Sequence, residues 1–66
     1  MEHYEREVLP RLEVARRLRH LAEQLEKGTV SVGRVSGPLP ELVELKLEFE
    51  SRDGKGELEI EIEWPS

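Results

Sequence analysis

The chain has 66 residues, of which 36% are hydrophobic and 38% are charged, and its fifteen acids and ten bases give a net charge of −5. This length allows one domain at most, and the absence of cysteine excludes disulfides and thiolate metal or redox sites. No apolar run is long enough for a membrane-spanning helix, and the acidic balance argues against nucleic-acid binding, which needs a basic surface.

Composition also bears on origin and location. Fourteen glutamates and seven arginines, with no asparagine and a single glutamine, are typical of a thermophilic source or of a designed chain. Residues 1–7 are polar and charged and no apolar stretch follows them, so we expect no secretory signal peptide and a cytoplasmic location.

The first half of the chain predicts an arm and a helix. Residues 1–9 alternate charged and less polar side chains, which fits an N-terminal arm or a short strand. From about residue 10 to 27 the apolar positions recur with the period of an amphipathic helix. Pro10 suits the first helical position and Gly28 suits the left-handed position after the last turn. The apolar face of this helix contains Leu12, Val14, Ala15, Leu18, Leu21, Ala22 and Leu25.

After Gly28 the sequence period changes from 3.6 to 2. Residues 29–32 predict a short strand, and the glycines and prolines that follow predict a loop. Residues 42–51 and 57–64 then alternate between apolar and charged side chains, as half-buried strands do. Asp53-Gly54 lies between them and is a strong hairpin signal.

A two-residue turn at Asp53-Gly54 fixes the register of this hairpin. It places Phe49 opposite Leu58 and, at the far end, Val43 opposite Trp64, so that apolar side chains meet apolar ones throughout. The opposite face then holds the pair Lys46–Glu61 and three like-charge pairs, which are mildly destabilising. A slip of one residue would place apolar side chains opposite charged ones, so burial fixes the register. The remaining expected pairs are Leu47–Ile60, Leu45–Ile62, Glu44–Glu63, Glu48–Glu59 and Glu50–Glu57.

A sheet with one apolar face needs a cover, and residues 11–27 are the only candidate within the chain. We therefore expect an α+β fold in residues 10–66, with one amphipathic helix packed on a small antiparallel sheet of about three strands. Trp64 is expected to close one end of this helix–sheet interface.

Three segments in this order resemble the amphi-Trp domain family, a small bacterial and archaeal domain. They are the helix VARRLRHLAEQLEKG at 14–28, the proline-led strand LPELVELKLEFE at 39–50, and the strand ELEIEIEW at 57–64. The likeness covers residues 11–64 and departs from the family at Leu9-Pro10, where a polar capping residue is usual. It implies the fold but no reaction, because the family has no established activity to carry over.

The acidic side of the predicted hairpin is the candidate binding surface. It fits an electrostatic docking site for a basic partner, either another protein or the helix of a second copy. It also fits a solubilising face without a partner. A phosphate-mimicking surface is a weaker interpretation. A divalent-ion site is also weaker, because calcium prefers ligands wrapped by a loop. The residues of this face are Glu44, Glu48, Glu50, Glu57, Glu59, Glu61 and Glu63, with Lys46 among them.

No pattern of catalytic or cofactor-binding residues stands out. His3 and His20 have no partners at metal-ligand spacing, and no phosphate loop or nucleophile elbow occurs. We therefore expect a non-enzymatic chain without metal or cofactor.

The function expected from these features is protein–protein interaction through the acidic face. The alternatives are a purely structural or self-assembling protein, and a small-molecule or metal binder. A chain this short has a core that contributes only about 3–5 kcal/mol, so self-association, as a homodimer, is also expected.

Overall fold

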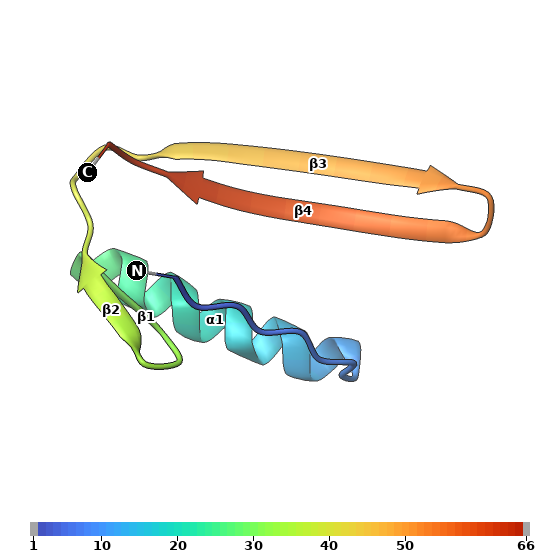
Figure 1. The fold of residues 1–66 in the computed structure, drawn as a ribbon, viewed down its shortest axis with the longest axis horizontal. Helices are drawn as coiled ribbons and strands as arrows, with labels where there is room; N and C mark the ends of the chain where they lie inside the picture. The colour runs from blue at the N-terminus through green and yellow to red at the C-terminus, as the bar shows by residue number, and fades with distance from the viewer. Residues whose placement is uncertain (1, 66) are drawn as a thin grey trace.

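The computed structural model describes residues 2–65, which form one helix and four strands (Figure 1). Met1 and Ser66, which the expected arm and domain include, lie outside the described residues. The α+β class is confirmed, but the strands form two separate two-stranded sheets instead of one sheet of about three strands. The elements are α1 (Arg11–Lys27), β1 (Thr29–Val32), β2 (Val35–Pro38), β3 (Glu44–Arg52) and β4 (Lys55–Glu63).

Helix α1 begins and ends beside the residues expected to bound it. Pro10 is the N-cap and not the first helical residue, because its ψ of 143° is extended. Its carbonyl oxygen accepts hydrogen bonds from the amides of Glu13 and Val14, at 3.0 and 3.2 Å. Gly28 has the expected left-handed conformation, with φ 79°, and its amide donates to the carbonyl of Leu25. The glycine thereby satisfies a carbonyl group that the last turn leaves free.

Strand β2 was not expected, because glycine and proline within a short run argue against a strand. It pairs with β1 in an antiparallel hairpin, with Val32 opposite Val35. Gly33 has φ 59° at the first position of the two-residue turn, where tight hairpins favour glycine. Pro38 is tolerated because it ends the strand of a two-stranded sheet.

The β3–β4 hairpin has the predicted register. Phe49 pairs with Leu58, and the six other pairs predicted between Glu44 and Glu63 are also present. Asp53 and Gly54 have φ values of 50° and 76°, the double positive φ of the turn that Asp-Gly favours. The strands run from 44 to 52 and from 55 to 63, so each is shifted by one or two residues from its expected bounds.

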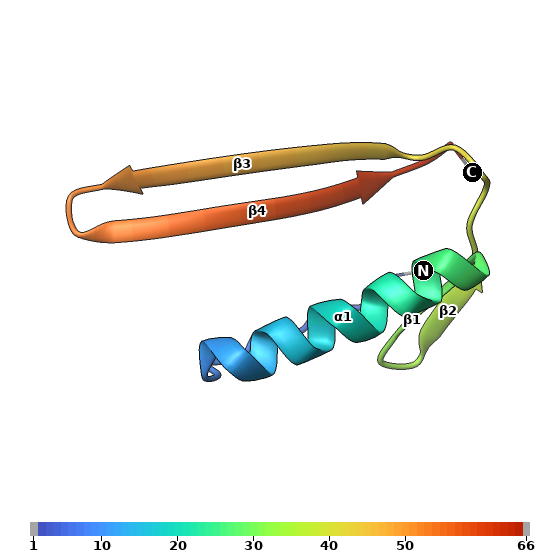
Figure 2. The same ribbon diagram turned by 180° about the vertical axis from the view of Figure 1, so that it is seen from behind.

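The expected cover of the hairpin by the helix is wrong for the single chain. Within residues 2–65, α1 contacts β1 and makes no contact with β3 or β4. No described residue is fully buried, and Leu47 in the middle of the apolar face is 65% exposed. The reason lies at the end of β2, where the amide of Leu39 donates to the carbonyl of Gly28 at 2.9 Å. This bond ties the chain to the C-terminal end of the helix, and the hairpin then runs back toward the N-terminal end of α1 without contacting it (Figure 2).

Residues 2–10 form an extended arm and no strand. The arm runs back along α1 (Figures 1 and 2). The guanidinium of Arg17 donates to the carboxylate of Glu7 at 2.9 Å, which fixes the arm near the middle of the helix. No helix among the described residues is long and apolar enough to cross a membrane.

Candidate functional site

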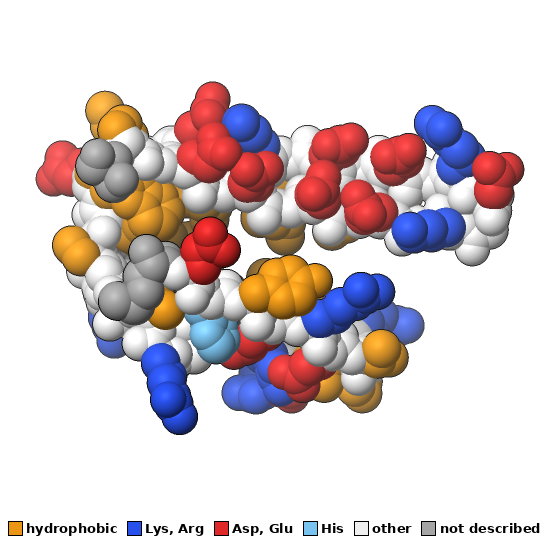
Figure 3. All heavy atoms as spheres, viewed as in Figure 1, with side chains coloured by type: hydrophobic (Ala, Val, Ile, Leu, Met, Phe, Trp, Pro, Cys, Tyr) orange, Lys and Arg blue, Asp and Glu red, His pale blue; other side chains and the backbone are white. Residues whose placement is uncertain are grey.

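The alternation along β3 and β4 places all seven predicted glutamates on one side of the hairpin. The register sets three pairs directly opposite one another, Glu44–Glu63, Glu48–Glu59 and Glu50–Glu57. All seven residues are exposed. Acidic side chains dominate the hairpin in the space-filling view, whereas basic side chains gather over the helix and arm (Figure 3). The predicted set is therefore brought together as one continuous surface, the acidic face.

Lys46 is the one base in the middle of the acidic face. It stands opposite Glu61 in the register, but its ammonium group contacts the diagonal Glu63 at 3.0 Å and Glu44 at 3.9 Å. The hydrogen bond to Glu63 raises the pKa of Lys46. Hydrogen bonds from Glu61 and Lys46 lower the pKa of Glu63. Lys46 thus compensates the Glu44–Glu63 end of the face, and at the turn end Arg52 contacts Glu50 at 3.4 Å.

Within residues 2–65, no ion pair involves Glu48 or Glu59 at the centre of the acidic face. The charge of Glu57, followed by that of Glu48, raises the pKa of Glu59. A hydrogen bond to Glu63 is the main cause that raises the pKa of Glu61. Carboxylates this close repel one another, and a cation placed over them would relieve the repulsion. The face therefore favours a positively charged surface.

Every carboxylate of the acidic face is exposed. The carboxylates project from a flat ribbon into solvent, where no desolvated pocket separates their pKa values. Among residues 2–65 no three histidine, cysteine, aspartate or glutamate side chains are placed to hold a metal ion. What the face offers is a broad electrostatic potential.

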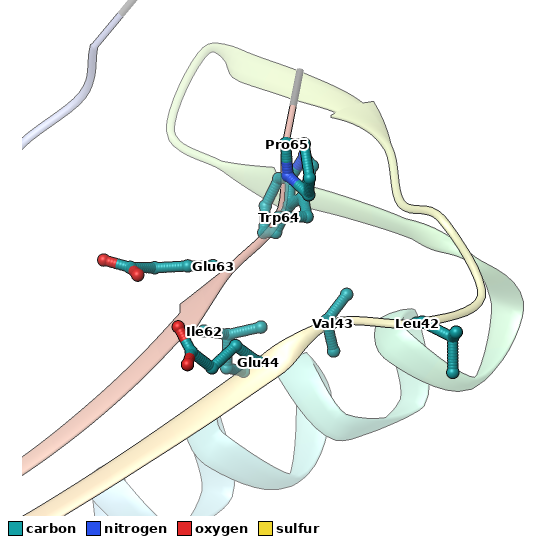
Figure 4. Close-up of a pocket in the computed structure, with 7 residues that line it drawn as sticks. All are labelled: Leu42, Val43, Glu44, Ile62, Glu63, Trp64 and Pro65. Atoms are coloured by element: carbon teal, nitrogen blue, oxygen red, sulfur yellow. The ribbon is translucent and has the colours of Figure 1, made fainter.

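Trp64 lies at the open end of the hairpin, beside an open groove formed by residues 42–44 and 62–65 (Figure 4). Val43, its expected partner across the hairpin, lines the same groove. Trp64 is half-buried. It does not close a helix–sheet interface, because α1 does not contact the hairpin.

The apolar side of the hairpin is a second surface, which sequence reasoning treated only as core. Phe49 is 77% exposed and Leu58 is 65% exposed. The alternation of apolar and charged residues shows that one face is apolar. It does not show what covers that face. This apolar face consists of Leu45, Leu47, Phe49, Leu58, Ile60 and Ile62.

A smaller hollow lies between the arm, α1 and the β1–β2 turn. Its two arginines are already paired, since Arg16 and Arg17 both contact Glu13 and Arg17 also contacts Glu7. His20 shares a hydrogen bond with Gln24 at 3.2 Å. These pairings leave little positive charge for an anion, so the hollow is a structural contact of the arm.

Comparison with known proteins adds no relative. No protein-family model matches the chain, and no curated protein or solved structure matches it either.

Proposed function

We propose that this chain is a non-enzymatic protein-interaction module of the amphi-Trp type that acts in the cytoplasm. Its acidic face docks onto a basic surface of a partner protein. The observation that carries the proposal is the set of like-charge pairs across β3 and β4. Lys46 compensates the Glu44–Glu63 pair and Arg52 contacts Glu50, but within residues 2–65 no base contacts the central pair Glu48–Glu59. Like charges placed opposite one another weaken a hairpin, and a basic partner would offset that cost while steering association.

Affinity capture with matched variants tests this function. One variant replaces three glutamates of the acidic face with glutamine, at Glu48, Glu59 and Glu61. The control replaces three glutamates outside it, at Glu23, Glu26 and Glu41, so that both variants lose the same charge. We expect the wild type and the control to capture partners that the acidic-face variant does not capture. Salt should elute these partners. Equal capture by both variants, or no salt-sensitive partner, contradicts it.

A second candidate function is self-assembly, with the acidic face serving only to keep the assembly soluble. The exposed apolar face of the hairpin favours it, because a contiguous apolar patch on a small protein marks an association surface. Light scattering at several concentrations separates a self-assembling chain from a strict monomer.

A further inference from the structure

Two apolar surfaces of the chain lack a partner. One is the apolar face of the hairpin defined above. The other is the N-terminal half of the apolar face of α1, where Leu12, Val14 and Leu18 are exposed, whereas Leu21 and Leu25 near β1 are half-buried. The β1–β2 hairpin covers only the C-terminal end of the helix, to which Gly28 connects it. No other strand of the described chain contacts α1.

The solvent-accessible surface of the chain is larger than that of a compact protein of the same mass. The chain exposes 6516 Å², whereas a compact protein of 7.7 kDa exposes about 4,300 Å². The radius of gyration is 13.6 Å, against about 11 Å for a compact chain of this length. Two copies that each bury the excess would remove about 4,400 Å² in total, which lies within the range of obligate homodimers.

The helix of a second copy fits the apolar face better than a second hairpin does. Residues 44–63 carry eight acids and three bases, a net charge of −5, so two hairpins repel one another. Residues 11–27 carry three acids and five bases, a net charge of +2. The lengths also match, because the nine residues of β3 span about 30 Å and the 17 residues of α1 span about 26 Å.

The connection between β2 and β3 holds the hairpin apart from its own helix. Leu39 is tied to Gly28 by a hydrogen bond, and Pro38 and Pro40 on either side of it restrict the backbone. From this point the hairpin runs back along the direction of its own helix but does not contact it (Figure 1). An open arrangement joined by a short, stiff connection is the arrangement that exchanged dimers use.

We infer that two copies form a two-fold dimer in which the apolar face of each hairpin packs on α1 of the other copy. Leu47 and Ile60 of one copy then lie over Leu18 of its partner. Each acidic face remains outside, in solvent. The inference deepens the self-assembly candidate and rests on it, and it leaves the acidic face available for a basic partner.

Two adjacent positions on β3 give a matched test by sedimentation equilibrium. Leu47→Lys puts a charge into the proposed interface, whereas Glu48→Lys puts the same side chain on the acidic face of the same strand. The inference expects Leu47→Lys to weaken dimerisation by about 100-fold or more, as for a buried interface anchor, and Glu48→Lys to remain dimeric. A monomeric wild type overturns it, as does equal dimerisation of both variants.

Disulfide trapping identifies the pairing even if Leu47→Lys fails to fold. The chain has no cysteine, so single variants Leu18→Cys and Leu47→Cys can be mixed and oxidised. We expect more of the mixed disulfide between the two variants than of either disulfide that joins two copies of the same variant. Dominant Leu47→Cys pairs would show hairpin-on-hairpin packing and overturn it. An intrachain disulfide in the double variant, with no mixed dimer, would show closure on the same chain's helix and also overturn it. A dimer that forms this disulfide but does not bind basic partners would refute the acidic-face proposal alone.

Discussion

Phe49 stands directly opposite Leu58 across the β3–β4 hairpin, yet the two residues are 77% and 65% exposed. The pair is therefore correctly registered but not covered. A cross-strand apolar pair contributes to a hairpin mainly when its face is removed from water. The hairpin in the described chain thus has the register that its sequence predicts, but its apolar face is not buried.

The turn at Asp53-Gly54 gives a direct test of how the local sequence stabilises the hairpin. Gly54 has φ 76°, a conformation that costs a residue with a side chain about 1–2 kcal/mol. Gly54→Ala is therefore expected to lower the free energy of unfolding by about that amount. Gly56→Ala is the control, because a Cβ there meets nothing within 4 Å and the backbone needs no positive φ. Denaturant unfolding should show Gly56→Ala within about 0.5 kcal/mol of wild type.

The hairpin was predictable because two independent signals agree. Strict alternation from Val43 to Trp64 defines the apolar side, and Asp53-Gly54 defines where the chain turns. The seven glutamates of the acidic face were found for the same reason. Strand β2 was missed because Gly37 and Pro38 weaken the alternation, while the turn signal at Gly33 is a single glycine.

The contact between Gly33 and His3 predicts how the arm is held. A Cβ at Gly33 would overlap the ring of His3, and its φ of 59° already disfavours a side chain. Gly33→Ala should therefore displace the ring of His3, loosen the arm and speed hydrogen exchange in α1 around His20. Adding His3→Ala should remove the overlap but not the backbone strain. If the double variant is destabilised at least as much as Gly33→Ala alone, the Cβ at position 33 does not overlap the His3 ring.

Repulsion on the acidic face predicts a stability gain in mild acid. Neighbouring charges raise the pKa of Glu59, so its contribution to stability is full below the ordinary pKa of 4.5 and is lost as pH rises through the folded value. The unfolding temperature should therefore rise as pH falls from neutral toward 4.5. Glu59→Gln should raise the unfolding temperature at neutral pH and reduce this dependence. A variant that unfolds at a lower temperature at neutral pH would argue against repulsion at Glu59.

Glu13 predicts the opposite change at lower pH. Its hydrogen bonds with Arg16 and then Arg17 lower the pKa of Glu13 to about 2. Its contribution is present above the ordinary pKa and is lost as pH falls from 4.5 through about 2. Glu13→Gln should remove that part of the acid loss in circular-dichroism melts. Glu26→Gln is a control on the same helix, since no ion pair of Glu26 occurs within residues 2–65.

The cover of the apolar face was not predictable from one sequence. Periodicity at Leu18 and at Leu47 shows that each residue belongs to an apolar side, but it does not show whether their partners lie in the same chain. That choice depends on the direction in which residues 39–43 lead the hairpin. In this structure the bond from Leu39 to Gly28 fixes that direction.

The molar mass in solution tests most directly whether a second copy provides the missing cover. Sedimentation equilibrium on the wild-type chain, over a range of concentrations, measures that mass without any substitution. We expect a species of twice 7.7 kDa that dissociates only on dilution and loses helix and strand signal as it does so. A folded species of 7.7 kDa at every concentration would contradict it.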